Sequence, residues 1–114
     1  MNIQSFNNFC QALAHSTHVV QWGGSHVWKI GGKMFAVCSQ PKIGGLGFTF
    51  RCSELSYQLL LEQPGCRTAP YFKDPWIQCF SQDALDDAAL KLYIGASYKL
   101  IFAKLPKKLQ LQLS

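Results

Sequence analysis

Four lysines near the C-terminus are the residues of this sequence best suited to binding: Lys99, Lys104, Lys107 and Lys108. The chain carries 11 Lys and Arg against 6 Asp and Glu, a formal net charge of +5. All of that excess lies after residue 90, where lysines occur and no acid does. A lysine that neutralises a phosphate releases the counterions condensed on the nucleic acid, and this release favours binding. The cluster therefore predicts contact with DNA or another polyanion. The alternative is a solvated helix end whose lysines only offset the helix dipole.

A second basic group lies on strands that we expect to be neighbours, and it consists of Lys29, Lys33 and Arg51. Trp28 alternates with Lys29, and a sheet face that mixes aromatic and basic side chains can stack bases and hold phosphates. The same alternation fits Trp28 in the core and Lys29 in water. We favour that second interpretation for the pair, and keep the strand residues as a second contact for a nucleic acid.

Aromatic residues concentrate in an irregular segment, residues 71–76, which includes Tyr71 and Trp76. Exposed aromatic loops often bind partners. Together with Trp22 and Trp28 they define the alternative hypothesis, a surface for another protein or a small ligand. The loop can equally fold back over the core as a lid, and the sequence does not decide between these.

Residues capable of metal binding or catalysis are present but poorly spaced. His15 and His18 are three apart, yet Ser16 and Thr17 are typical of a helix end, and no acid or cysteine completes a ligand set. No nucleophile has an evident base beside it. We therefore expect no metal site, no cofactor and no enzymatic activity. The cysteines are too widely spaced for a disulfide framework, and we expect buried thiols; they are Cys10, Cys38, Cys52, Cys66 and Cys79.

The composition indicates one domain. A chain of 114 residues with 48% hydrophobic residues is long enough for one core and too short for two. Only 15% of residues are charged, which leaves room for an apolar contact surface, so we expect a monomer or a weak dimer. No stretch approaches the roughly 20 apolar residues that span a bilayer, and the first residues do not resemble a signal peptide. We expect a cytoplasmic protein without a membrane partner.

Hydrophobic periodicity and turn residues predict helices and strands in an α+β order. We expect helices over 2–14, 53–63 and from 86 or 87 to about 105, and strands over 19–22, 27–30, 33–38, 46–52 and 76–80. Residues 66–75 are expected to be irregular. The Leu-Gln tail, 109–114, can dock, fray, pair or stay disordered. Antiparallel strands joined by short turns, with helices set apart, predict a two-layer domain in which helices back an antiparallel sheet.

Several segments, taken in order, resemble the MmcQ/YjbR family of small bacterial proteins. They are Trp22-Gly23, the run Lys29 to Ala36, the Pro64-Gly65-Cys66 break, the aromatic turn ending in Trp76, and the run Ser97 to Lys108. The resemblance covers almost the whole chain. It implies a single domain over 1–114 with a CyaY-like, or double-wing, fold of the order α-β-β-β-β-α-β(-β)-α. It brings no agreed catalytic residues, and its DNA-binding association is an analogy of fold.

Overall fold

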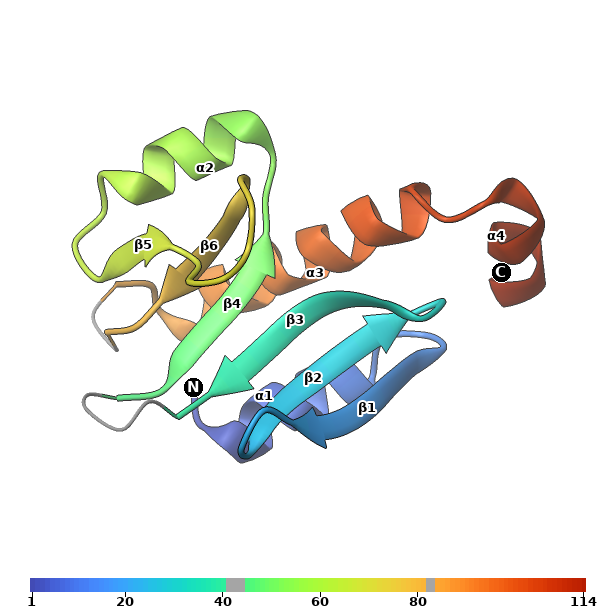
Figure 1. The fold of residues 1–114 in the computed structure, drawn as a ribbon, viewed down its shortest axis with the longest axis horizontal. Coiled ribbons are helices and arrows are strands. Elements are labelled where there is room, and N and C mark those ends of the chain that lie inside the picture. The colour runs from blue at the N-terminus through green and yellow to red at the C-terminus, as the bar shows by residue number, and fades with distance from the viewer. Residues whose placement is uncertain (41–44, 82–83) are drawn as a thin grey trace.

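The computed structural model describes residues 1–40, 45–81 and 84–114. In chain order the elements are α1 (Ile3–Gln11), β1 (Ser16–Gln21), β2 (Ser25–Ile30), β3 (Lys33–Ser39), β4 (Gly47–Arg51), α2 (Glu54–Leu61), β5 (Cys66–Thr68), β6 (Trp76–Cys79), α3 (Asp87–Ala103) and α4 (Lys107–Leu113). The strands form one antiparallel sheet with the order β1-β2-β3-β4-β6-β5 (Figure 1). This is the predicted α+β domain.

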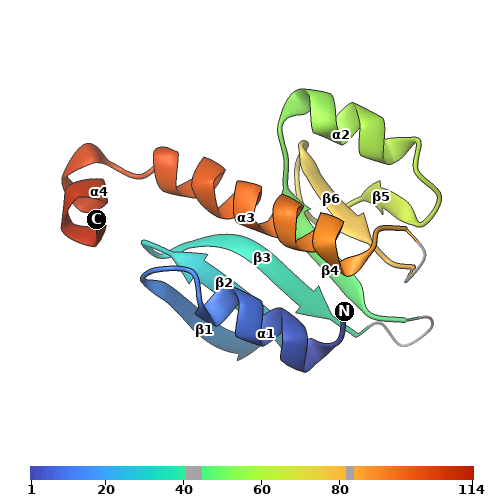
Figure 2. The same ribbon diagram turned by 180° about the vertical axis from the view of Figure 1, so that it is seen from behind.

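One face of the sheet is covered by helices. Seen from behind, α1 and α3 lie in front of the strands, and α2 lies beside β5 and β6 (Figure 2). Fully buried aromatic side chains fill the space between the layers, among them Phe6, Phe35 and Phe50. We call this side of the sheet the covered face and the other side the open face. The open face is the one toward the viewer in Figure 1.

A buried serine ties α3 to the sheet. The register of β2 and β3 shifts between Trp28 and Lys29, so that Phe35 has no direct partner across the ladder. The hydroxyl of Ser97 donates to the Phe35 carbonyl at 2.6 Å and accepts from the Arg51 backbone N–H at 3.0 Å. Ser97 is 0% exposed. The serine thus pairs two backbone groups that would otherwise be buried without partners.

Two segments of the family resemblance meet in space. Gly31, in the turn between β2 and β3, has φ +58°, and a Cβ there would lie 2.6 Å from Leu105 Cδ1. Two features therefore favour glycine at position 31: the left-handed backbone conformation and the close approach of the Leu105 side chain. Tyr98 packs edge-on against Phe35 and donates its hydroxyl proton to the Ala14 carbonyl at 2.6 Å. These contacts hold the β2–β3 hairpin and the turn after α1 against α3 and the residues that follow it.

The boundaries differ from the sequence prediction in three places. The tail forms α4, whose Leu109 and Leu113 pack against the core, because an apolar residue recurs on one side of a short helix. Residues 66–68, expected to be irregular, form the edge strand β5. The first strand begins earlier than predicted, at Ser16, and ends at Gln21, so that Trp22 belongs to the turn.

The five cysteines are free and buried, as predicted. Cys66 and Cys79 face each other across β5 and β6, with their Sγ atoms 3.5 Å apart. Within the described residues, no helix is long and apolar enough to cross a membrane.

Candidate binding surface on the open face of the sheet

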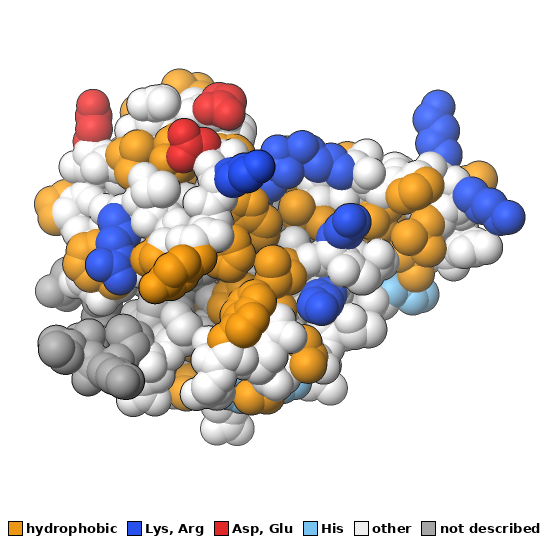
Figure 3. Space-filling view, viewed as in Figure 1, with side chains coloured by type: hydrophobic (Ala, Val, Ile, Leu, Met, Phe, Trp, Pro, Cys, Tyr) orange, Lys and Arg blue, Asp and Glu red, His pale blue; other side chains and the backbone are white. Residues whose placement is uncertain are grey.

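The open face is a mixed surface of apolar, aromatic and basic side chains. Cross-strand partners share a face of the sheet, which places one row on this side: Val19, Val27, Val37, Thr49, Gln78 and Arg67. Hydrophobic side chains gather over the middle of the sheet, and Lys and Arg run from there toward α4 (Figure 3). The acidic side chains visible in this view lie over and beside α2. The charge on this face is therefore segregated.

Three predicted basic residues meet in one hollow, which we call the basic pocket. Lys33 of β3, Arg51 of β4 and Lys104 at the end of α3 line it together with Trp76. Met34 and Ile101 complete its wall, and its volume is about 260 Å³. The pocket forms because the β2–β3 hairpin and the end of α3 pack on each other. It brings together residues that are more than 70 positions apart in the sequence.

The other predicted lysines lie around this pocket or away from it. Lys29 is the direct cross-strand partner of Met34, so it shares the face on which Met34 lines the basic pocket. Lys107 and Lys108 are exposed residues of α4, which lies beyond the end of α3 (Figure 1). They extend the positive surface without lining the basic pocket.

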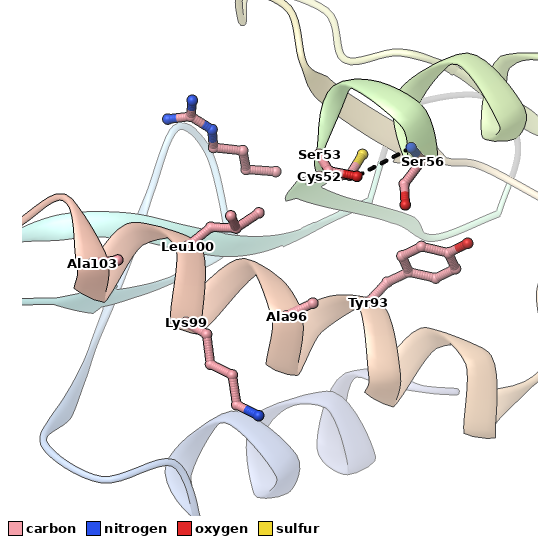
Figure 4. A pocket seen from close by; sticks show the side chains of 9 residues that line it. Cys52, Ser53, Ser56, Tyr93, Ala96, Lys99, Leu100 and Ala103 are labelled. Atoms are coloured by element: carbon pink, nitrogen blue, oxygen red, sulfur yellow. Dashed lines mark hydrogen bonds between the residues drawn. The ribbon is translucent and has the colours of Figure 1, made fainter.

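Lys99 lies in a different hollow, between α2 and α3. This interhelical pocket has a volume of about 350 Å³ and is lined by Ser53, Tyr93, Lys99 and also Arg51. In Figure 4 the Lys99 side chain extends toward α1, away from Ser53 and Ser56 at the start of α2. Arg51 lines both pockets, but Lys99 is not part of the surface that contains Lys33. The structure thus divides the basic residues that the sequence had grouped.

Aromatic side chains form an arch over the remainder of the open face. Trp22, from the β1–β2 turn, lies edge-on to Phe72, with ring centroids 6.5 Å apart. Phe72 in turn stacks on Trp76 at 5.1 Å. The turn after β1 and the loop after β5 start at opposite edges of the sheet, so their side chains meet above it. Beneath the arch is the largest hollow described, the aromatic pocket, of about 770 Å³.

Polar groups form one wall of the aromatic pocket. Arg67 donates from Nε and Nη2 to Gln78 Oε1, at 2.9 and 2.7 Å. Gln78 Nε2 donates to Thr49 Oγ1 at 3.4 Å, and the Arg67 guanidinium lies 4.7 Å from the Phe80 ring centroid. Gly47 leaves the space for this chain, because a Cβ there would come within 2.9 Å of Gln78 Nε2. Arg67 is therefore held in one orientation.

Two rim residues of the aromatic pocket have unusual backbone conformations. Trp22 has φ 54° and is 59% exposed, and Tyr71 has φ 69° and is fully exposed. Left-handed conformations are unfavourable for bulky side chains and cluster at functional sites. Both aromatic side chains are thus held in solvent contact at a cost to the backbone.

Trp28 does not belong to the aromatic surface, and its inclusion there was wrong. It is 4% exposed and lies on the covered face, where its Nε1 donates to Asn7 Oδ1 at 2.9 Å. Successive residues of a strand point to opposite faces, so Lys29 lies on the other side of β2 from Trp28, as the favoured interpretation of the alternation predicted. The aromatic residues that do share the open face are Trp22, Tyr71, Phe72 and Trp76.

Two histidines meet at the edge of the covered face, and they are His18 and His26, not His15 and His18, the pair considered and rejected from the sequence. His18 stacks on Trp28 and on His26, and its Nε2 lies 3.0 Å from His26 Nδ1. Burial, followed by the charge of His26, lowers the pKa of His18. His15 lies in the turn before β1, with φ 62°. Across the part of the chain that the structure describes, no three His, Cys, Asp or Glu side chains could hold a metal ion.

Sequence reasoning missed Arg67, Phe72 and Gln78. Arg67 was missed because β5 is only three residues long and gave no alternating pattern. Gln78 lies within a predicted strand, and its polar side chain between the buried Ile77 and Cys79 was the available signal. Phe72 lies within the aromatic segment that the sequence had singled out.

The fold and the surface define a class of protein: a two-layer α+β domain whose six-stranded antiparallel sheet is covered by helices on one face only. A family model named YjbR matches residues 11–100, and the chain belongs to the YjbR family. The structure is similar to a crystal structure of a protein from Pseudomonas syringae determined by a structural genomics consortium, with a TM-score of 0.73 and 18% sequence identity. The match covers 89% of this chain and 99% of that one. A comparison with curated proteins finds no match.

Proposed function

We propose that the open face binds nucleic acid, with the basic pocket holding phosphates and the neighbouring aromatic side chains stacking on bases. The observation that carries this is the convergence of Lys33, Arg51 and Lys104 beside Trp76. Lys107, Lys108 and Lys29 extend the same positive surface. Lys99, in the interhelical pocket, is left out of this interface.

A single strand fits this surface better than a duplex. The bases of a single strand are free to stack on exposed rings, and each stacked base contributes about 1–3 kcal/mol. Trp22 and Tyr71 are exposed, and Trp76 lines the basic pocket directly. The alternative of a protein partner uses the same rings but has no need of the lysines.

The test is fluorescence anisotropy with labelled single-stranded and duplex DNA between roughly 50 and 200 mM salt, the range over which phosphate contacts lose most affinity. We expect saturable binding of the single strand with a steep salt dependence. Lys104→Glu and Lys33→Glu should each weaken it by at least about tenfold, since one lost charge contact also becomes repulsive.

Lys91→Glu provides the matched control. Lys91 is an exposed lysine of α3 that lines none of the pockets described here, and the substitution changes the net charge by the same amount. Equal losses for Lys91→Glu and Lys104→Glu would mean that only net charge matters. Absence of binding at the lowest salt would exclude the proposal.

A further inference from the structure

The aromatic pocket has the size and the walls of a small-molecule site. Its volume of about 770 Å³ lies within the range of about 300–1,000 Å³ typical of such sites. Val37 and Met34 provide an apolar floor, and Trp22, Tyr71 and Phe72 provide flat aromatic walls. Flat walls at the rim of an apolar floor favour a planar ring system, which can stack on them.

The charge of the pocket selects the sign of the ligand. Arg67 is the one charged residue among the described residues that line it. Gln78 occupies Nε and Nη2 on one side of the guanidinium, and Phe80 packs against the same group. The remaining guanidinium N–H groups make no hydrogen bond with the described residues. A fixed guanidinium with free donors is well suited to a carboxylate or a phosphate.

We propose that the aromatic pocket binds a small planar organic anion, with its ring against Trp22 and Tyr71 and its negative group on Arg67. This goes beyond the nucleic-acid proposal: it shares the rings of Trp22 and Tyr71 with that proposal, but its anionic group lies on Arg67 and not on the lysines of the basic pocket, so either proposal can fail without the other. Two sources share this chemistry, a mononucleotide and an aromatic carboxylate. The ligand is recognised by one ring and one charge.

The experiment measures binding of four probes by the intact protein with isothermal titration calorimetry. The probes form two pairs, each an anion with a neutral compound that keeps the same ring system: adenosine monophosphate with adenosine, and naphthoate with naphthamide. At least one anion should bind at least about tenfold more tightly than its neutral partner, because charge-assisted hydrogen bonds to one arginine contribute at this scale. The pair that shows the difference identifies the source.

Two variants assign the binding to this pocket. Arg67→Gln should reduce the affinity for the anion roughly ten- to hundredfold, down to that of the neutral probe. Tyr71→Ala should weaken every ring-containing probe, and it leaves the fold intact because Tyr71 is fully exposed. Lys73→Gln removes the same charge from an exposed position of the adjacent loop and should leave the affinity unchanged.

The outcomes separate this proposal from the previous one. Lys104→Glu should weaken strand binding at least about tenfold and leave probe binding intact, whereas Arg67→Gln should abolish the charge preference for the probes. Equal affinity for charged and neutral probes, an unchanged charge preference in Arg67→Gln, or no binding of any probe at millimolar concentration would overturn the proposal. Probe binding without strand binding would exclude only the nucleic-acid proposal.

Discussion

The two faces of the sheet use similar residue types in opposite ways. On the covered face, aromatic rings such as Phe50 are fully buried, and polar groups such as Ser97 are paired with backbone. On the open face, Trp22 and Tyr71 are exposed, and Arg67 lines a hollow with guanidinium N–H groups that make no hydrogen bond within the described part of the chain. An antiparallel sheet commonly packs one face on its core and leaves the other in water. Here the open face carries the exposed rings of Trp22 and Tyr71, and the acidic side chains visible on it lie over and beside α2 (Figure 3).

This difference separates the parts of the family resemblance. The runs around Gly31 and Ser97 contact each other and the turn after α1, and these contacts stabilise the fold. Lys33 and Lys104 belong to the same two runs but point into the basic pocket. The two runs therefore join the β2–β3 hairpin to α3 in the core, and they also place Lys33 and Lys104 in the basic pocket.

The largest expected effect comes from removing one buried ring from the covered face. Phe50→Ala removes a ring that is 0% exposed and stacks on Tyr93 at 5.6 Å, and it should lower the free energy of unfolding by about 3–5 kcal/mol. The matched change on the open face is Phe72→Ala, which should cost less than roughly half as much, because Phe72 is only partly buried. Urea unfolding measures both. Similar losses would contradict the division into a structural and a binding face.

The next largest effect concerns the serine between α3 and the sheet. Ser97→Ala leaves the Phe35 carbonyl and the Arg51 N–H buried without their partner, which should lower the free energy of unfolding by about 1–3 kcal/mol. Ser39→Ala, on the open face, should change it by less than about 0.5 kcal/mol. A loss for Ser97→Ala no larger than the Ser39→Ala control would show that water replaces the hydroxyl.

The covered face was largely predictable from the sequence. The element order followed from helix caps, the Gly31-Gly32 turn and the apolar periodicity. Each of these signals lies within the helix, strand or turn that it specifies, so it can be recognised without knowing the tertiary contacts. The predicted β2–β3 hairpin, residues 33–38 of which became β3 (Lys33–Ser39), illustrates this. The α4 helix was missed because its leucines alternate with glutamines, a pattern equally typical of a strand. The choice between helix and strand depends on the packing of Leu109 against the core, which the sequence does not show.

The open face was predictable in residue type but not in arrangement. The lysines looked like one group because they are close in sequence, yet Lys99 of α3 lines the interhelical pocket and Lys104, the C-cap of the same helix, lines the basic pocket. Arg67 reaches the aromatic pocket only through pairing of the short β5 with β6. The contact of Trp22 with Phe72 depends on a turn and a loop from opposite edges of the sheet, and no local pattern encodes such a meeting.

A smaller effect tests whether the open face is held at a cost in stability. Trp22→Asn replaces an exposed ring at φ 54° by a residue that tolerates the left-handed region. We expect the free energy of unfolding to be unchanged or to rise by up to about 1 kcal/mol. Binding of the planar anion probes should weaken in the same variant. A clear loss of stability would mean that Trp22 is a packing residue, and the contrast between the two faces would narrow.

The smallest expected effect is a dependence of stability on pH, and it comes from His18 at the edge of the covered face. Because burial and His26 lower the pKa of His18, the folded protein binds a proton there less readily than the unfolded chain, whose histidines titrate near about 6.5. Above that pH both states are neutral at His18 and stability is unaffected. As the pH falls through it, the unfolded state takes up the proton first and stability decreases. Thermal unfolding at pH 7.5 and 5.5 should show this decrease, and His18→Gln should reduce it. The same pH dependence in His18→Gln would assign the titration to another group.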